Sequence, residues 1–250
     1  MDGLVQGEVV TFIDLCAGIG GFSLGLEWAG MVCKGQVEIN AYCNRVLAKH
    51  WPNVPRWKDV KECAASPDIL PSVDLICGGY PCQPFSLSGK RKGKDDDRHL
   101  WPFFKQILAA KKPAWCLFEN VAGHVTMGLD DVLSDLDVLG YSTGALLIPY
   151  CAINSKDRRR RVWILAHSPS YELQRGASPP AERGDGKTST DEQLAGFLLT
   201  SDRASVSVAR AYRSGHGVPQ GSHRNKALGN AIKPQMAREI GLAILATYRE

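Results

Sequence analysis

Short apolar runs alternate with segments of helical length along residues 9–166, and this alternation constrains the fold more than any other feature of the chain. The runs are rich in β-branched residues, which is typical of buried strands. Glycines or a Trp-Pro pair end several of the intervening segments, as they end helices. The pattern predicts an α/β fold with a Rossmann-like, doubly wound, mostly parallel sheet and helices on both faces. The expected strands are residues 9–16, a strand that ends at residues 37–39, and residues 73–77, 114–118, 145–148 and 162–166. The expected helices are residues 22–29, 41–50, 100–111, 129–139 and 231–248.

The alternation stops at residues 168–222, which are rich in Pro, Gly, Ser and Arg and hold one short apolar cluster at residues 194–199. A chain of 250 residues can bury one substantial core with room for a small second lobe. We therefore expect residues 1–167 and 223–250 to form one domain and residues 168–222 to form a small irregular lobe.

The composition narrows the class of protein. The sequence has no N-terminal apolar signal segment and no run of about 18 apolar residues, so we expect neither secretion nor a membrane span. Its eight cysteines include no Cys-x-x-Cys pair and its six histidines show no metal-ligand spacing, which favours reduced thiols in a cytoplasm and no metal site. The net charge of +4 points only weakly to a polyanionic partner. We expect a monomer.

A rigid loop follows the apolar run at residues 73–77. Its sequence, Gly-Gly-Tyr-Pro-Cys-Gln-Pro-Phe-Ser at residues 78–86, combines two glycines and two prolines around a single thiol, Cys82. Ligands of open α/β sheets bind at the carboxyl ends of the strands, where this loop begins. An isolated cysteine is usually a small buried hydrophobe. The other motifs instead favour Cys82 as a nucleophile.

A glycine turn at residues 18–21 joins the first expected strand to the first helix, and Glu38 ends the second strand. Such a turn lets a ligand approach the backbone, and such an acid can accept hydrogen bonds from a ribose. Ser23 stands where the dinucleotide fingerprint has its third glycine, so a nucleoside cofactor without a pyrophosphate fits better than NAD. The alternative is a turn that only packs strand on helix. Asp59 and Val60 lie where a strand after the one at residues 37–39 would end, and they could hold an adenine amino group, although an Asp in a loop is usually a cap or a solvated charge.

Glu119 closes the expected strand at residues 114–118. Burial beside apolar neighbours would raise its pKa, and a neutral carboxylic acid can donate a hydrogen bond or proton to a ring nitrogen. A helix cap or a salt bridge is the alternative.

Two basic segments accompany these motifs. Residues 158–161 are four consecutive arginines before the strand at residues 162–166, and in an extended segment Arg159 and Arg161 would share one side. They form either a solvated charge run or a set of phosphate and base contacts. Residues 90–94, Lys-Arg-Lys-Gly-Lys, follow the Cys82 loop and could close over a phosphodiester backbone.

Taken in this order, the motifs resemble those of the C5-cytosine DNA methyltransferases. Phe-Ile-Asp-Leu-Cys-Ala-Gly-Ile-Gly-Gly-Phe at residues 12–22 is similar to the first motif of that family, and Pro81-Cys82-Gln83 matches its nucleophile motif. The further matches are Glu119-Asn120-Val121, the Arg-x-Arg at residues 159–161, and Gly229-Asn230 before the last helix. The resemblance spans residues 9–166 and about 224–250, and it implies the fold of the S-adenosylmethionine-dependent methyltransferases.

The resemblance implies transfer of a methyl group from S-adenosylmethionine to C5 of a flipped-out cytosine in double-stranded DNA. Cys82 would attack C6 as a thiolate, with its pKa lowered from about 8.5 by nearby cations. Glu119 would protonate or hydrogen-bond N3, Arg161 would contact the base O2, and Arg159 would support the pocket.

The resemblance also implies the binding residues. Those expected to contact the cofactor are Cys16, Gly18, Ile19, Gly21, Glu38, Ile39, Asp59, Val60, Pro81, Leu100, Asn230 and Ala231. Those expected to contact DNA are Gln83, Ser86, Ser88, Lys90, Arg91 and Arg98. A restriction endonuclease encoded alongside is the protein partner that the resemblance suggests.

Three positions depart from the family pattern. Cys16 and Ile39 stand where aromatic residues commonly contact the adenine, which predicts modest cofactor affinity, and Asp157 replaces a glutamine before the two arginines. The lobe at residues 168–222 is short for target recognition, which leaves relaxed specificity, a degenerate lobe or help from another chain as alternatives. Methylation of RNA cytosine, or a non-catalytic DNA-binding or regulatory role, are the alternative functions.

Overall fold

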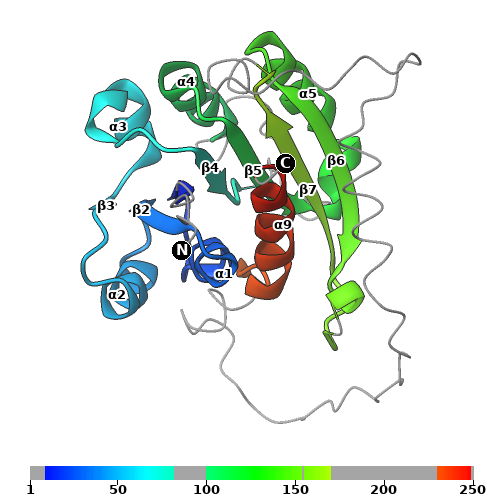
Figure 1. The fold of residues 1–250 in the computed structure, drawn as a ribbon, viewed down its shortest axis with the longest axis horizontal. Coiled ribbons are helices and arrows are strands. Elements are labelled where there is room, and N and C mark those ends of the chain that lie inside the picture. The colour runs from blue at the N-terminus through cyan, green and yellow to red at the C-terminus, as the bar shows by residue number, and fades with distance from the viewer. Residues whose placement is uncertain (1–8, 82–99, 154, 170–229, 249–250) are drawn as a thin grey trace, which may run out of the picture.

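The structure, a computed structural model, describes residues 9–81, 100–153, 155–169 and 230–248. Its described part is a seven-stranded sheet with helices on both faces (Figure 1). The strands are β1 Thr11–Leu15, β2 Val32–Val37, β3 Arg56–Trp57, β4 Leu75–Gly78, β5 Trp115–Val121, β6 Ser142–Pro149 and β7 Arg160–His167. The helices are α1 Gly21–Ala29, α2 Ala41–His50, α3 Val60–Ala65, α4 Trp101–Lys111, α5 Leu129–Val138 and α9 Pro234–Thr247, with short 3₁₀ turns η1 Pro67–Ile69, η2 Ala122–Thr126 and η3 Tyr150–Ile153.

The strand order is β3-β2-β1-β4-β5-β7-β6. All neighbouring strands pair in parallel except at β7, which runs antiparallel to both β5 and β6. The chain leaves β1 toward β2 on one side and reaches β4 on the other, so the carboxyl ends of β1 and β4 form a topological switch point. In open α/β sheets a crevice for ligands lies at that point.

Residues of the central strands alternate between two hydrophobic layers. Phe12 of β1 and Leu75 of β4 belong to the layer that packs against α1 and α9. Their chain neighbours Ile13 and Ile76 belong to the opposite layer, under α3, α4 and α5. A strand buried on both faces must be apolar at successive positions, which explains the near-continuous apolar runs in the sequence.

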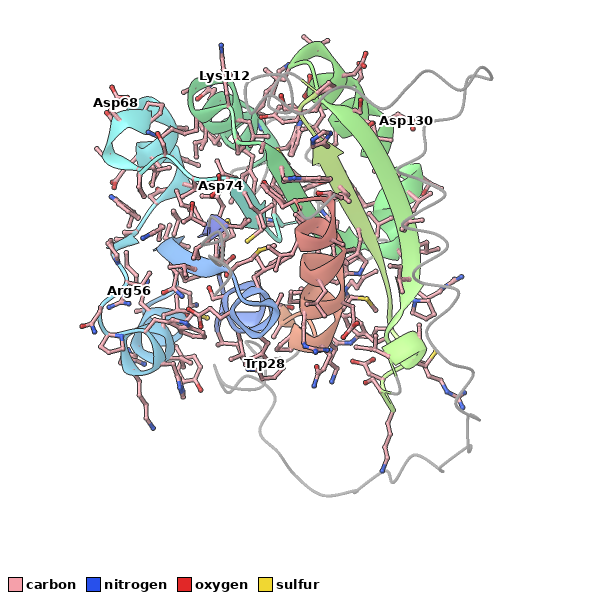
Figure 2. All side chains as sticks on the ribbon, viewed as in Figure 1. Trp28, Arg56, Asp68, Asp74, Lys112 and Asp130 are labelled. Carbon is pink, nitrogen blue, oxygen red and sulfur yellow. The ribbon has the colours of Figure 1, made fainter. Side chains whose placement is uncertain are left out.

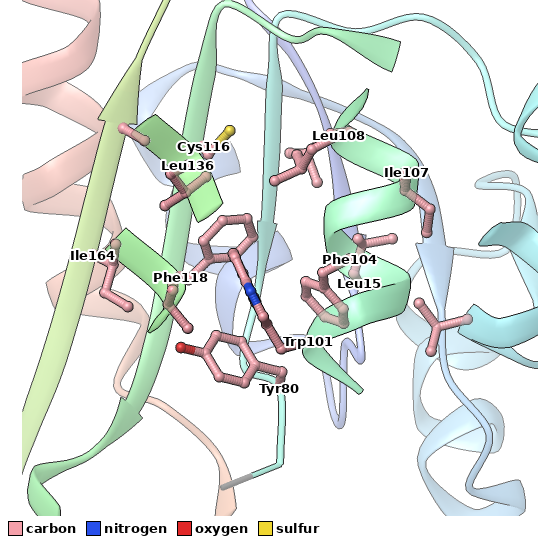
Figure 3. Packing of buried hydrophobic residues seen from close by; sticks show 14 of the residues in the cluster. Leu15, Tyr80, Trp101, Phe104, Ile107, Leu108, Cys116, Phe118, Leu136 and Ile164 are labelled. Carbon is pink, nitrogen blue, oxygen red and sulfur yellow. The ribbon is translucent and has the colours of Figure 1, made fainter. Parts of the chain in front are cut away.

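An aromatic cluster fills the layer under α4 next to the end of β4 (Figure 3). The ring of Tyr80 lies 5.3 Å from Trp101, 5.7 Å from Phe104 and 6.2 Å from Phe118, centroid to centroid. Such tilted and edge-to-face contacts are favourable for aromatic pairs. The cluster fixes the chain where it leaves the sheet toward Pro81.

Helix α9 returns to the sheet and lies beside α1 (Figure 1). Gly25 permits the close approach, because a Cβ atom on it would overlap the carbonyl oxygen of Pro234. Exposed charged residues such as Asp68, Lys112 and Asp130 lie at the periphery (Figure 2). Trp28, on the outer side of α1, is 49% exposed.

The predicted α/β fold class is confirmed, and α1, α2 and α4 lie within one residue of their expected bounds. The last helix was expected from residue 231 but begins at Pro234, because a proline fits the first turn of a helix and Lys233 is extended. Helix α3 was not expected. The lobe predicted at residues 168–222 lies, except for its first two residues, outside the described part of the chain.

Candidate functional site

The glycine turn after β1 is tied to the end of β2 through one carboxylate. Glu38 accepts a 2.7 Å hydrogen bond at Oε2 from the backbone N–H of Gly18 and another of 2.7 Å at Oε1 from the N–H of Asn40. Gly18 has a φ of 58°, in the left-handed region that glycine favours. Each carboxylate oxygen can accept a second hydrogen bond, so Glu38 keeps capacity for a ligand.

A buried polar cluster lies directly beneath this turn. Ser23 donates to Oδ2 of Asp14 from its backbone N–H, at 3.1 Å, and from its hydroxyl, at 2.8 Å. Gln36 donates from Nε2 to the Ser23 hydroxyl at 3.0 Å. Ser23, which breaks the dinucleotide fingerprint, therefore locks α1 onto β1. Asp14 is not among the predicted site residues, although an acid inside an apolar run is a signal for such a cluster.

Asp14 is fully buried, and desolvation raises its pKa to about 7 although the Ser23 hydrogen bonds act in the opposite direction. Burial therefore outweighs the two hydrogen bonds from Ser23, and the charged form of Asp14 is disfavoured.

A cavity of about 970 Å³ opens at the carboxyl ends of β1, β2 and β4. Every residue expected to contact a cofactor lines it: Cys16, Gly18, Ile19, Gly21, Glu38, Ile39, Asp59, Val60, Pro81, Leu100, Asn230 and Ala231. Glu119 and Arg161 line the same cavity. Asp59 also caps α3, accepting a 2.9 Å bond from the N–H of Lys61, so it is a helix cap and a lining residue at once.

Glu119 is 7% exposed, and its Oε1 lies 2.7 Å from Nε of Arg161. These two atoms form a close ion pair at the wall of the cavity. Desolvation raises the pKa of Glu119 to about 7, against the opposing effects of Arg161 and Arg159. The raised pKa expected from burial is therefore found.

Arg159 and Arg161 share one side of their segment, as expected. Their guanidinium carbons lie 5.4 and 5.8 Å from the ring centre of Tyr150, which is fully buried. Arg161 faces the cavity, whereas Arg159 is not among its lining residues and is held by Asp157. Tyr150 and Asp157 thus complete the arrangement of the two arginines.

The chain that enters the Cys82 loop is held at Tyr80. Asn120 donates from Nδ2 to the Tyr80 carbonyl at 3.2 Å, and the Tyr80 hydroxyl lies 2.8 Å from Nε2 of His124. Burial lowers the pKa of His124, which keeps its imidazole neutral at neutral pH. His124 was not anticipated, because nothing in its local sequence indicates a contact with Tyr80.

Cys82 lies outside the described residues, as do the expected DNA contacts Gln83, Ser86, Ser88, Lys90, Arg91 and Arg98. Two described thiols, Cys16 and Cys43, line the cavity. Desolvation, followed by the charge of Glu38, raises the pKa of Cys16 far above its usual value and that of Cys43 to about 11. Both thiols are therefore protonated at neutral pH and are poor nucleophiles.

Among the described residues no group of three or more His, Cys, Asp or Glu side chains could hold a metal ion. In the same part of the chain no helix is long and apolar enough to cross a membrane.

The family model of the C-5 cytosine-specific DNA methylases matches residues 10–206. The chain belongs to this family. It is 35% identical over 167 residues to the Type II methyltransferase M.HgiBI of Herpetosiphon aurantiacus, covering 65% of this chain and 38% of that protein. It is 31% identical over 170 residues to M.HhaI of Haemophilus parahaemolyticus, covering 66% and 51%. This member of the methylase family thus spans about half or less of the length of these relatives.

Solved structures share the methylase fold. A protein of an E. coli prophage, named as a DNA modification methyltransferase, aligns with a TM-score of 0.66 and 17% identity over 96% of this chain and 100% of its own. A DNMT2 mutant of Spodoptera frugiperda aligns with a TM-score of 0.56 and 21% identity, covering 70% of this chain and 54% of its own.

Proposed function

We propose that the protein is a DNA (cytosine-5)-methyltransferase that uses S-adenosylmethionine and forms a covalent bond between Cys82 and C6 of a flipped-out cytosine. The observation that carries the proposal is the position of Glu119. This buried acid, with a pKa of about 7, lines the same cavity as Gly18 and Glu38, which are hydrogen-bonded to each other and form the cradle of the site. Pro81, which precedes Cys82, lines that cavity too.

The cavity fits the nucleoside cofactor. The two carboxylate oxygens of Glu38 each accept one backbone hydrogen bond, from Gly18 and from Asn40. A ribose diol could donate to the remaining lone pairs of these oxygens. Ile39 and Val60 supply apolar surface for an adenine, and the Asp59 carboxylate lies beside them. Bound S-adenosylmethionine would supply an electrophilic methyl group. Pro81, Leu100, Asn230 and Ala231 would surround its methionine end.

The remaining side chains fit the chemistry of a cytosine. C5 of cytosine is a poor nucleophile, and addition of the Cys82 sulfur to C6 makes it an enamine carbon that can accept the methyl group. Attack places charge on the ring, which a hydrogen bond or proton from Glu119 to N3 would relieve. Arg161, beside Glu119, would contact the base O2. Loss of the C5 proton to a base and departure of the sulfur restore the ring.

The proton on Glu119 determines the expected pH dependence. Because the pKa of Glu119 is raised to about 7, the acid is protonated below neutral pH and loses its proton as pH rises. We expect the rate that depends on Glu119 to fall above about pH 7. The target base must also leave the duplex, at a cost of a few kcal/mol.

The experiment that tests this proposal combines labelled S-adenosylmethionine, duplex DNA and mapping of 5-methylcytosine. We expect label at C5 of cytosine and a covalent adduct with DNA that contains 5-fluorocytosine. Cys82→Ser should abolish both. Glu119→Gln should lower the rate by about 100-fold or more while the protein still unfolds at a similar temperature.

Two alternatives are outcomes of the same experiment. Label in tRNA but not in DNA would favour an RNA methyltransferase, since the same chemistry works on a splayed RNA base. A folded, cofactor-bound protein that labels neither substrate and forms no adduct would favour a non-catalytic DNA-binding relative. Sequencing methylated plasmid from cells that make the protein would give its target sequence.

We also propose that the protein is a monomer that works in the cytoplasm, with a restriction endonuclease encoded alongside; the Type II names of its relatives support the endonuclease partner. Sizing in solution, with and without a duplex that holds the target sequence, tests the monomer.

A further inference from the structure

Asp157 holds Arg159 at three points. Its Oδ1 accepts the backbone N–H of Arg159 at 2.9 Å. Its Oδ2 lies 2.7 Å from Nε and 2.6 Å from Nη2 of the same residue. Contact with two nitrogens of one guanidinium fixes the orientation of that group, which a single hydrogen bond would leave free to swing.

Within the described part of the chain, each of the two arginines beside Tyr150 contacts a carboxylate. Asp157 pairs with Arg159, and Glu119 pairs with Arg161 at 2.7 Å. Both guanidinium groups lie within 6 Å of the buried Tyr150 ring, so the pairs are near neighbours. Arg159 is close enough to stabilise the charged form of Glu119. How far its charge is compensated must therefore affect Glu119.

We propose that Asp157 is a positioning residue of the catalytic pocket: it clamps and largely neutralises Arg159, so that Arg161 is the principal cation acting on Glu119. The catalytic consequence rests on the proposed methyltransferase function, but the electrostatic one does not. A neutral amide at this position could orient Arg159 but could not neutralise it, so the carboxylate of Asp157 contributes charge as well as geometry.

The surroundings of Glu119 give the direction of the effect. The described groups near it are Arg161 and Arg159, the Tyr150 hydroxyl and, across the cavity, the acids Glu38 and Asp59 with the cations Lys58 and Lys61. Lys233, whose Nζ lies 3.9 Å from Oδ2 of Asp157, is a further cation that this carboxylate compensates. Removing the Asp157 charge leaves Arg159 and Lys233 less compensated. Both changes favour ionised Glu119.

The test is a carboxyl-¹³C NMR titration of Glu119 in the full chain without DNA or cofactor. In Asp157→Asn we expect the pKa of Glu119 to fall by about half a unit or more, which is about a twofold loss of the protonated form at pH 7 and about a threefold loss at pH 8. Glu239→Gln is the matched control, because it removes one carboxylate charge from an Arg238 pair on α9. This control should leave the pKa of Glu119 unchanged.

A double-mutant cycle separates an effect through Arg159 from a direct effect of the Asp157 charge. In an Arg159→Gln background, the added Asp157→Asn change should shift the Glu119 pKa much less than in the wild type. An equal shift in both backgrounds, or no shift from Asp157→Asn alone, would overturn the proposal. Chemical shifts of the core methyl groups report whether each variant is folded.

Methylation assays then measure the catalytic consequence. We expect Asp157→Asn to move the alkaline limb of the kcat profile to lower pH and to reduce kcat several-fold at pH 8, with the KM for S-adenosylmethionine unchanged. A changed KM with an unmoved profile would show a structural role instead and contradict positioning. If the wild type methylates no nucleic acid, the methyltransferase proposal fails while the NMR result still decides the role of Asp157.

Discussion

Two buried carboxyl groups, Asp14 and Glu119, have a pKa raised to about 7 for the same reason and with different consequences. Desolvation is the largest cause at both. Glu119 faces the cavity and has Arg161 beside it, so its proton can reach a ligand. Asp14 is enclosed beneath the glycine turn and bonds to Ser23. Glu119 is therefore placed to exchange a proton with a ligand, whereas the titration of Asp14 affects the stability of the fold.

Asp14 should make the protein less stable as pH rises. Its pKa is 3.8 when unfolded and about 7 when folded, so between these values the folded state binds a proton that the unfolded state does not. The stabilisation is complete below about pH 4 and is lost as pH rises through about 7, by up to about 4 kcal/mol. Asp14→Asn removes this titration. Thermal unfolding between pH 5 and 8 should show a flatter fall of Tm in the variant than in the wild type.

The wild type is the control for that slope, because Glu119 titrates in the same direction in both proteins. The variant can be less stable at every pH, since an amide fits the Ser23 contacts less well. Parallel slopes in the two proteins would contradict the assignment of the pH dependence to Asp14.

At the scale of the elements, the approach of α9 to α1 determines where the last part of the cavity wall lies. Asn230, Ala231 and Ile232 precede α9 and line the cavity. A Cβ on Gly21 would lie 2.6 Å from Cγ1 of Ile232, so this wall sits directly on the first turn of α1. Any displacement of α9 should therefore change the affinity of the cavity for a ligand.

Replacing two glycines of this contact by alanine should have unequal effects. A Cβ on Gly25 would lie 2.2 Å from the backbone oxygen of Pro234, whereas a Cβ on Gly241 would lie 3.0 Å from Ala29 and Leu26, a milder overlap in which the Leu26 side chain can shift. Overpacking lowers the stability of a folded protein by about 1–3 kcal/mol. Replacing a helical glycine by alanine raises that stability by about 0.5–1 kcal/mol where no overlap arises. We expect Gly25→Ala to be the less stable variant in urea unfolding and the weaker binder of S-adenosylmethionine in calorimetry.

Gly241→Ala serves as the matched control in that pair, since both substitutions add one methyl group inside a helix of the same contact. Equal stability and equal affinity of the two variants would show that α9 moves without cost. The contact would then not position the cavity wall.

At the scale of the whole molecule, a cofactor that bridges β1, β2, β4 and the segment before α9 should stabilise the fold. At 100 times its dissociation constant a ligand adds about 2.7 kcal/mol, which for a chain of this size raises Tm by about 5–10 °C. We expect S-adenosylmethionine to give such a shift and Glu38→Gln to lose most of it. An amide offers only one acceptor oxygen for the N–H groups of Gly18 and Asn40, so the cradle is disrupted.

NAD is the control ligand, because Ser23 breaks the dinucleotide fingerprint and is locked to Asp14. A Tm shift with NAD as large as that with S-adenosylmethionine, or a full shift in Glu38→Gln, would contradict this account of the cavity. Differential scanning fluorimetry of each variant, with and without ligand, measures both.

The sequence determined those features that depend on short-range pattern. The alternation of apolar runs and helical segments was sufficient for the α/β class, and the Trp51-Pro52 pair was sufficient to locate the end of α2. Motif order was sufficient to bring Glu38, Asp59, Glu119 and Arg161 together as site candidates, and all of them line one cavity. Helix α3 was missed because it is six residues long and carries little periodic signal.

Only the tertiary structure decided which groups meet across long stretches of chain. Tyr80 contacts His124, 44 residues away, and Glu119 pairs with Arg161 across the β5–β7 ladder. The insertion of an antiparallel β7 between β5 and β6 has no local signature. Propensity and periodicity describe each residue's immediate neighbours, whereas these contacts depend on how the layers pack. That packing also buries Asp14 and Glu119, and burial is what raises the pKa of each.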